Sequence, residues 1–347
     1  MALWRAGPSR GRLGYVTGWV TGVPILLGVG LGVAHDTGMK TRRDFLASSV
    51  GLGIATGVGG RVLGPSSTHA AVERKGGALK IQICLKHGMI KEGKTIAEQM
   101  RAAKEAGFDG VEFEGPLAEE KVPEVLAAKA ETGLAVPGMV CGKVGRLVGS
   151  LDAAEREKGL EQFATTLRQA KQLGATTVLL YPGACDETKP YDKVFDVLIE
   201  SVGKLLPVAK ETGVAIALEN VWNNMFLSPL DVIRFVDHFN TPLVGWYFDI
   251  GNICRYGWPD QWIRALGPRI RKLDVKEFNR KKSMEAGPWA GFKVELGEGD
   301  IDWKAVCAAI DDVGYAGGWA SAEVPGGDLA RLKAICAWMH GVLVQKS

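Results

Sequence analysis

Four acidic residues in the second half of this 347-residue chain stand where short apolar runs end, and they are Glu219, Asp249, Asp274 and Glu323. If these runs are neighbouring parallel strands, their carboxyl ends meet, and the four carboxylates lie together in a partly buried site. Like charges at short range are unfavourable unless protons or a cation neutralise them. The pattern therefore predicts a divalent cation held by oxygen ligands, with Mg²⁺ or Mn²⁺ favoured over zinc.

Further polar and aromatic residues lie just after the ends of these apolar runs. Lys276 comes two residues after Asp274 and either stabilises developing enolate charge or simply offsets the carboxylates. Trp222 and Trp289, on expected loops, could form an aromatic platform for the apolar face of a sugar ring, although most tryptophans of this kind are core residues. The predicted substrate-binding residues are Lys86, His87, Trp222, Asn252, Glu277 and Arg280.

The elements that must position these residues alternate along the chain. Eight strand-like apolar runs cover residues 79–85, 110–113, 135–140, 177–181, 215–219, 244–249, 270–275 and 318–324. Segments of helical period lie between them at 96–106, 122–132, 153–173, 191–212, 229–239, 303–313 and 328–342. Five of these segments are followed by a glycine typical of a helix C-cap, namely Gly107, Gly133, Gly174, Gly213 and Gly314.

This alternation predicts the α/β class and a single (β/α)₈ TIM barrel preceded by an N-terminal signal segment. An open doubly wound sheet usually has a glycine-rich phosphate loop after its first strand, and residues 84–89 contain no such motif. Active sites of barrels lie at the C-terminal ends of the strands. The long connection at 277–302 is therefore expected to form the rim of the site.

Composition narrows the possible partners. Hydrophobic residues make up 46% of the chain and charged residues 23%, as in an ordinary globular protein. The net charge is +3 and much of the excess precedes residue 75, so nucleic acid is not expected as a partner. Six cysteines without a CxxC pair indicate buried thiols more than a zinc site.

The first 71 residues are predicted to be a leader, with the barrel domain at 72–347. Residues 41–46, with Arg42 and Arg43, resemble a twin-arginine signal, and an apolar stretch and small residues near Ala71 follow. The expectation is therefore export to the periplasm, with the twin-arginine export machinery as a partner. Met39 is the favoured true start, and a membrane anchor at 19–34 is the less favoured alternative.

Several segments together resemble the xylose isomerase-like TIM barrel superfamily of sugar and sugar-phosphate isomerases and epimerases. They are Glu219-Asn220, Phe248-Asp249-Ile250-Gly251-Asn252, residues 272–277, residues 297–303 and Glu323-Val324. The resemblance implies that Glu219, Asp249 and Glu323 bind metal and that the two glutamates also transfer protons. It departs from the family pattern at Asp274 and Asn252, where histidine is usual, and a carboxylate ligand would make the site harder and more negative.

The leading hypothesis is a metal-dependent isomerase or epimerase that moves a proton next to a carbonyl of a small-molecule carbohydrate through an enediolate. The alternatives are a metal-dependent lyase or hydrolase of oxidised glycosides and a non-catalytic sugar-binding barrel. Phosphodiester cleavage, known from another branch of the superfamily, is disfavoured because the chain has only five histidines. The sequence leaves open whether the protein forms a homo-oligomer.

Overall fold

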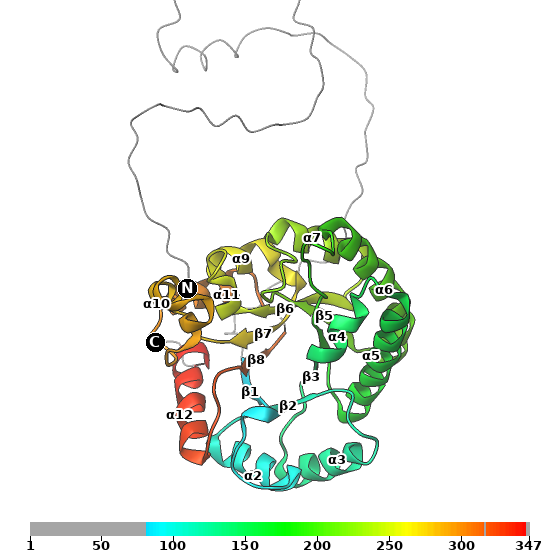
Figure 1. Cartoon of the computed structure of the whole chain (residues 1–347). Helices are drawn as coiled ribbons and strands as arrows, with labels where there is room; N and C mark the ends of the chain where they lie inside the picture. Colours follow the sequence, from blue (N-terminus) through cyan, green and yellow to red (C-terminus); the bar gives the residue numbers. More distant parts are fainter. Residues whose placement is uncertain (1–80, 316, 345–347) are drawn as a thin grey trace, which may run out of the picture. The chain divides into compact units, whose positions relative to one another are not determined.

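The computed structural model describes residues 81–315 and 317–344. Eight parallel strands pair in chain order, and β8 pairs with β1, which closes the sheet into a barrel (Figure 1). The strands are β1 (Gln82–Lys86), β2 (Gly110–Glu114), β3 (Gly138–Cys141), β4 (Thr177–Leu180), β5 (Ala215–Glu219), β6 (Val244–Asp249), β7 (Ile270–Val275) and β8 (Trp319–Ala322). The predicted (β/α)₈ fold is confirmed.

Helices surround the barrel on its outside (Figure 1). They are α2 (Ile96–Ala106), α3 (Lys121–Thr132), α4 (Gly142–Val148), α5 (Ala153–Leu173), α6 (Tyr191–Thr212), α7 (Pro229–His238), α8 (Ile250–Ile253), α9 (Pro259–Leu266), α10 (Arg280–Ala286), α11 (Trp303–Asp312) and α12 (Leu329–Met339). Short turns of other helix types are η1 (His87–Met89), η2 (Gly267–Arg269), η3 (Pro288–Phe292) and η4 (His340–Val344). The predicted bounds of α2, α5 and α6 match the structure.

Capping residues at the helix ends explain why the bounds of the long helices could be predicted from the sequence. Thr95 and Glu98 form a reciprocal capping box at the start of α2. At the other ends of α2, α3, α5 and α6, the glycines Gly107, Gly133, Gly174 and Gly213 have φ of 100°, 69°, 78° and 71°. A side chain is disfavoured at such angles, so glycine ends the helix there at little cost.

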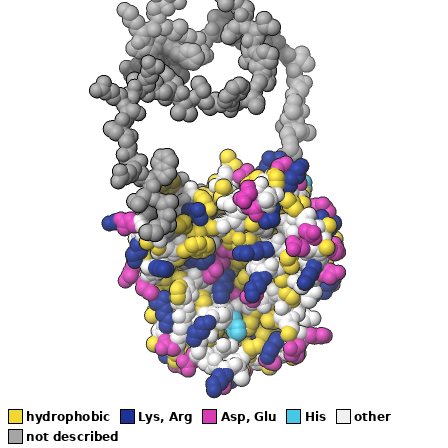
Figure 2. Space-filling model, viewed as in Figure 1, with side chains coloured by type: hydrophobic (Ala, Val, Ile, Leu, Met, Phe, Trp, Pro, Cys, Tyr) yellow, Lys and Arg dark blue, Asp and Glu magenta, His cyan; other side chains and the backbone are white. Residues whose placement is uncertain are grey.

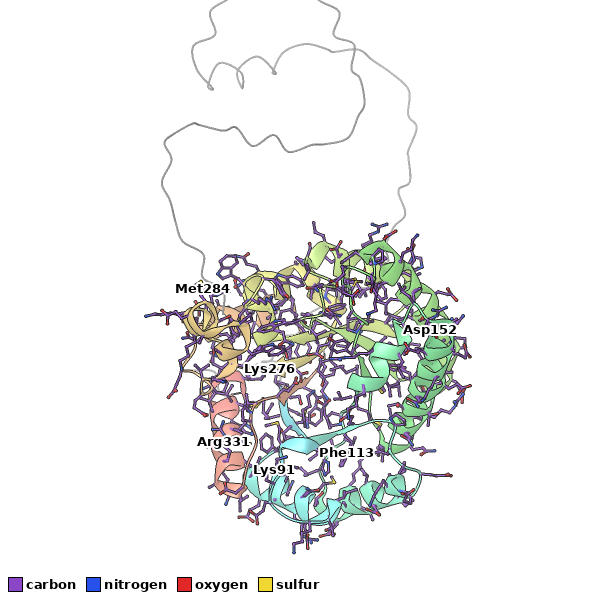
Figure 3. The ribbon with its side chains drawn as sticks, in the orientation of Figure 1. Lys91, Phe113, Asp152, Lys276, Met284 and Arg331 are labelled. Carbon is purple, nitrogen blue, oxygen red and sulfur yellow. The ribbon has the colours of Figure 1, made fainter. Side chains whose placement is uncertain are left out.

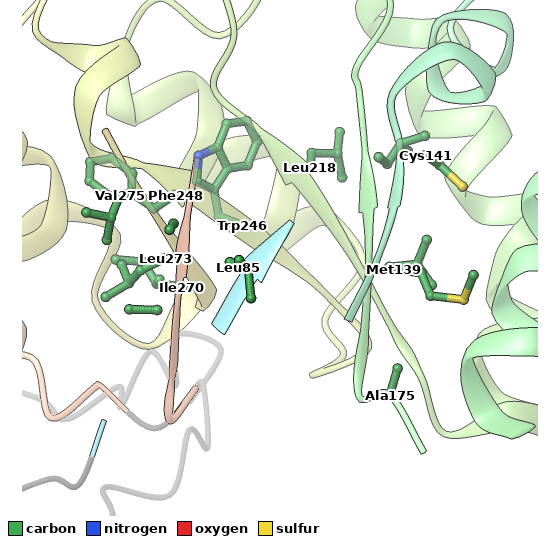
Figure 4. Close-up of a cluster of buried hydrophobic side chains, with 14 of the residues drawn as sticks. Leu85, Met139, Cys141, Ala175, Leu218, Trp246, Phe248, Ile270, Leu273 and Val275 are labelled. Carbon is green, nitrogen blue, oxygen red and sulfur yellow. The ribbon is translucent and has the colours of Figure 1, made fainter. Parts of the chain in front are cut away.

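The main hydrophobic core lies between the strands and the helices. Leu85, Leu218, Trp246 and Leu273 are fully buried and belong to this cluster (Figure 4). Because side chains alternate along a strand, the intervening residues face the inside of the barrel. The cysteines are mostly buried as expected: Cys84, Cys141, Cys185, Cys254 and Cys336 are buried and Cys307 is half-buried.

The inside of the barrel is apolar on one side and charged on the other. A small apolar cluster of Leu179, Ala217 and Tyr247 lies on β4, β5 and β6. Next to this cluster, Lys272 of β7, which pairs in register with Tyr247 of β6, forms a buried ion pair with Glu112 of β2, and both are at most 1% exposed. The Tyr247 hydroxyl donates to the Glu112 carboxylate at 2.7 Å. Barrel interiors are usually filled by branched apolar side chains, so this charged side is a departure.

The predictions about the chain's beginning lie outside the described residues. These are the leader at 1–71, the start at Met39, the twin-arginine motif and the anchor at 19–34. Within 81–315 and 317–344, no helix combines the length and apolar character needed to cross a membrane.

Replacing Lys272 by methionine should destabilise the barrel by about 3 kcal/mol, because breaking a buried pair leaves a carboxylate with too little compensation. Urea unfolding would measure the loss. The control is Lys304→Met on the exposed face of α11, which should change stability by less than about 0.5 kcal/mol. Equal stability of the two variants would show that the Lys272–Glu112 pair contributes nothing.

Candidate functional site

The four predicted acids come together at the C-terminal mouth of the barrel. Glu219 ends β5, Asp249 ends β6, Asp274 lies on β7 and Glu323 directly follows β8. One carboxylate oxygen from each lies within 4.8 Å of those of the others. Asp249 and Asp274 are fully buried, whereas the Glu323 side chain is 37% exposed. The site thus has a buried floor and one acid that faces the opening.

Two lysines border this carboxylate cluster. Lys276 Nζ lies 2.8 Å from Asp249 Oδ2 and 3.3 Å from Glu323 Oε1. Lys86 Nζ lies 2.7 Å from Asp274 Oδ1 and 2.8 Å from Glu112 Oε2. Lys276 lies near the centre of the barrel mouth (Figure 3), and side chains of both signs gather around the centre of this face (Figure 2).

The charges of this network do not cancel. Its acids are Glu112, Glu219, Asp249, Asp274 and Glu323, and its bases are Lys86, Lys272 and Lys276. When all of these groups are ionised, two negative charges remain. Asp249 Oδ2 and Asp274 Oδ1 are also buried and accept no hydrogen bond of ordinary geometry from the described residues, although each has a lysine at ion-pair distance. The residual charge and these two acceptors fit a divalent cation.

The two glutamates have pKa values shifted in opposite directions. Burial, followed by the charge of Glu323, raises the pKa of Glu219 well above its ordinary value. Burial also opposes ionisation of Glu323, but the ammoniums of Lys276 and Lys86 outweigh it and lower the Glu323 pKa. In such a pair, one carboxyl group can be protonated while the other is ionised. General acid and base catalysis requires this arrangement.

Asn220 fixes the buried acid of β6. Its side-chain Nδ2 donates to the Asp249 carbonyl at 2.7 Å, and its Oδ1 accepts from the Asp249 backbone N–H and from Trp246 Nε1, both at 3.0 Å. Neighbouring strand ends are thereby tied together at the site. In the sequence, Asn220 stood out only as part of the Glu219-Asn220 motif, and no role was predicted for it.

Asn252 takes part in the same network from α8. Its backbone N–H donates to Asp249 Oδ1 at 2.7 Å, and its side-chain Nδ2 donates to Glu219 Oε1 at 3.3 Å. Its Oδ1 accepts from Lys276 Nζ at 3.4 Å. Asn252 therefore orients Glu219, and it also lines a pocket at the barrel mouth.

Two pockets open at the carboxylate cluster and share Glu323. The first, of about 200 Å³, is polar and is lined by Lys86, His87, Gly88, Glu112, Glu114, Val140, Leu179, Glu219 and Glu323. The second, of about 270 Å³, is lined by Asn252, Lys276, Glu277, Trp289, Phe292, Val294, Glu323, Val324 and Pro325. Lys86 and His87, which were predicted to bind the substrate, both line the first pocket.

The other predicted substrate contacts are placed differently. Glu277 lines the second pocket but is only 2% exposed, and its Oε2 accepts from Gly297 N–H at 2.8 Å and Trp303 Nε1 at 2.9 Å, so it mainly anchors the long loop. Trp222 is half-buried and donates from Nε1 to the Asn252 carbonyl at 2.9 Å. Arg280 donates to the carbonyls of Cys254 and Gly257 and is not among the described residues that line the two pockets.

Two interior residues on which the position of Lys86 depends were not predicted from the sequence. Tyr247 and Lys272 both contact Glu112, and Glu112 in turn holds Lys86 beside Asp274. One signal was present in the sequence: Lys272 lies two residues before Asp274 in the same strand, where alternation directs both side chains to the same face.

The stability contributed by His87 should depend on pH. Burial lowers the pKa of His87 from its ordinary value of 6.5, so the unfolded chain binds this proton more readily than the folded one. This contribution is present above pH 6.5 and is lost as the pH falls below it. Between about pH 7.5 and about pH 5.5, the urea midpoint of the wild type should fall more steeply than that of His87→Gln. The exposed control His238→Gln should keep the wild-type slope, and equal slopes for all three proteins would contradict the prediction.

Known proteins share this fold and sequence pattern. A family model described as xylose isomerase-like TIM barrel matches residues 100–342. An L-ribulose-5-phosphate 3-epimerase of Escherichia coli is 26% identical over 264 residues, which is 70% of this chain and 88% of the relative. Among solved structures, a 3-keto-D-glucoside 4-epimerase from Escherichia coli superposes with a TM-score of 0.65 at 22% identity and covers 76% of this chain and 100% of its own.

A protein named IolI, solved with a zinc atom bound, superposes with a TM-score of 0.61 at 17% identity and covers 76% of this chain and 98% of its own. At such identities the structural likeness shows a common fold. The family model, by contrast, extends over more than half of the sequence, from residue 100 to residue 342. The chain therefore belongs to the xylose isomerase-like TIM barrel family.

Proposed function

We propose that this protein is a divalent-metal-dependent epimerase or isomerase that transfers a proton at a carbon next to a carbonyl of a sugar or sugar derivative. The observation that carries the proposal is the convergence of Glu219, Asp249, Asp274 and Glu323 within 4.8 Å of one another. Two of these acids have pKa values shifted in opposite directions, and a polar pocket of about 200 Å³ opens onto them.

The donor set fits a hard cation. All four candidate ligands are carboxylates, which Mn²⁺ and Mg²⁺ accept more readily than zinc does. When all acids of the network are ionised, one such ion would neutralise the two negative charges that the lysines leave uncompensated. When bound, the cation would polarise the carbonyl and the adjacent hydroxyl of a substrate and so make the neighbouring C–H bond more acidic.

The chain's own residues would move the proton. Glu323, kept ionised by Lys276 and Lys86, is suited to accept the proton from the carbon beside the carbonyl. Glu219, whose pKa is raised, is suited to return a proton. Delivery to the opposite face of the same carbon gives an epimer, and delivery to the neighbouring carbon gives an isomer. Lys276, 3.3 Å from Glu323 Oε1, would offset the charge that develops on the substrate oxygen.

The relatives support this proposal. Two of the similar proteins are named as epimerases of sugars or sugar derivatives, and IolI was solved with zinc. The predicted twin-arginine signal at residues 41–46 would place the enzyme outside the cytoplasm, where neutral sugars are more accessible than sugar phosphates. We therefore expect a neutral sugar or sugar derivative as the substrate.

Hydrogen exchange measured by NMR tests the proton transfer. With Mn²⁺ in deuterated water, the protein should introduce deuterium next to the carbonyl of at least one sugar in a panel of ketohexoses and keto-glycosides. Glu219→Gln and Glu323→Gln should each slow this exchange by about 100-fold or more, because each removes a general acid or base. Glu298→Gln makes the same change at an exposed position of the 277–302 loop, is not among the described residues that line either pocket, and as the matched control should retain the wild-type rate.

Three outcomes of that experiment would overturn the proposal. Exchange at the wild-type rate in both variants would remove the glutamates from the chemistry. Release of an aglycone without exchange would indicate a hydrolase, and tight binding of a sugar without exchange would indicate a receptor.

Metal analysis tests the ligand set without relying on activity. The purified protein should bind about one Mn²⁺ per chain, and Mn²⁺ should raise its melting temperature, since a ligand that binds only the folded state stabilises it. Asp249→Asn and Asp274→Asn should each weaken Mn²⁺ binding by about tenfold or more. Asp274→His should shift the preference towards Zn²⁺, because imidazole is a softer ligand than carboxylate. The exposed control Asp192→Asn should bind Mn²⁺ like the wild type, and unchanged binding in both cluster variants would refute the metal centre.

A further inference from the structure

A second, largely apolar pocket opens beside the proposed acid and base. Its walls combine the polar residues Asn252, Lys276, Glu277 and Glu323 with the apolar residues Trp289, Phe292, Val294, Val324 and Pro325. Its volume is about 270 Å³, and it shares Glu323 with the polar pocket of about 200 Å³. Ligand sites usually measure about 300–1,000 Å³. Each pocket is below this range, whereas the two together fall within it as one site with a polar and an apolar half.

The rings of the apolar half are held in place. The ring centroid of Trp222 lies 4.7 Å from that of Trp289 and 4.9 Å from that of Phe292, and Phe292 lies 5.0 Å from Phe278. The Trp222 indole is fixed by its hydrogen bond to the Asn252 carbonyl at 2.9 Å. A Cβ at Gly291 would lie 2.4 Å from the Phe278 ring, so glycine there lets the turn of η3 close onto that ring.

Trp289 is 68% exposed despite these contacts. A large aromatic side chain gains stability when it is buried, so leaving one at the surface forgoes that contribution. Its loop is also anchored, since Glu277 accepts hydrogen bonds from Gly297 N–H and Trp303 Nε1. An exposed ring on an anchored loop loses little conformational freedom when a second ring packs against it, and this favours a binding role for Trp289.

Lys276 is the one lysine or arginine among the described residues that line this pocket, and it is already paired. Lys276 Nζ already lies 2.8 Å from Asp249 and 3.3 Å from Glu323. The Glu277 carboxylate accepts hydrogen bonds from Gly297 N–H of the long loop and from Trp303 Nε1. An anionic group in this pocket would have to compete with the carboxylates of Asp249 and Glu323 for Lys276, whereas a neutral ring needs no ion pair and would cover the aromatic wall. The pocket is suited to a neutral ring with an apolar face.

We propose that the pocket formed by Trp289, Phe292, Val294, Val324 and Pro325 is a subsite for a second, neutral ring joined to the reacting sugar, so that the substrate is a glycoside and not a free monosaccharide. The second ring is either another pyranose or an aryl group, since both present an apolar face. The assignment of the reacting sugar to the polar pocket rests on the proposed function.

Calorimetric titration of the full chain tests this subsite with three probes in the presence of Mn²⁺. The probes are methyl β-D-glucopyranoside, phenyl β-D-glucopyranoside and cellobiose. At least one probe with a second ring should bind about tenfold more tightly than the methyl glycoside, which corresponds to about 1.4 kcal/mol. Trp289→Ala should abolish that advantage and leave binding of the methyl glycoside unchanged, and Trp289→Phe should retain part of it.

Trp258→Ala is the matched control, because Trp258 is 58% exposed and is not among the described residues that line either pocket. It should keep the full preference for a second ring. Thermal unfolding should show that both alanine variants are folded, as expected for exposed side chains. A gain with cellobiose alone identifies a sugar as the second ring, and a gain with the phenyl glycoside alone identifies an aryl group.

The proposal is overturned if all three probes bind equally, if neither probe with a second ring binds measurably, or if Trp289→Ala keeps the preference. Its failure is separable from that of the proposed function. Hydrogen exchange without a ring preference would refute only the subsite. A ring preference that depends on Trp289, in a protein without any exchange activity, would refute only the proposed chemistry.

Discussion

Repulsion among buried carboxylates is the constraint on which this site depends. Four acids lie within 4.8 Å of one another, and Glu112 adds a fifth negative charge to the same network. Removing one charge from water costs several kcal/mol, so such a group persists only when opposite charges surround it. Lys86 and Lys276 each approach the cluster from one side. In the proposed function, a divalent cation at the centre would balance the remaining charge and leave the mouth open to a substrate.

The interior of the barrel is organised around this requirement. On its apolar side, Leu179 and Ala217 pack as a normal core. On its charged side, Glu112 forms ion pairs with both Lys272 and Lys86. Burial opposes ionisation of Glu112, but Lys272 and Lys86 lower its pKa well below the ordinary value. A permanently ionised Glu112 can hold Lys86 against Asp274. The charged interior thus positions the Lys86 ammonium at the site.

The loops that follow the strands divide the site into regions with different chemistry. The loop after β1 supplies His87 to the polar pocket, and the longest loop, after β7, supplies Trp289 and Phe292 to the apolar one. Glu323 lines both pockets, so a substrate that fills both halves would place the junction of its two parts beside the proposed base. If the proposed subsite is correct, these loop residues, and not the barrel core, would determine which group attached to the sugar is accepted.

Local signals in the sequence were sufficient for the eight strands, the long capped helices and the acids at the strand ends, because burial periodicity, αL glycines and strand termini each depend on a few neighbouring residues. The short helices α4, α8, α9 and α10 were missed, since one or two turns show too little periodicity. The contact of Lys272 with Glu112, 160 residues away, and the gathering of Trp222 with Trp289 were decided only by the tertiary structure. Barrel closure and loop packing join residues whose sequence separation carries no signal of their contact.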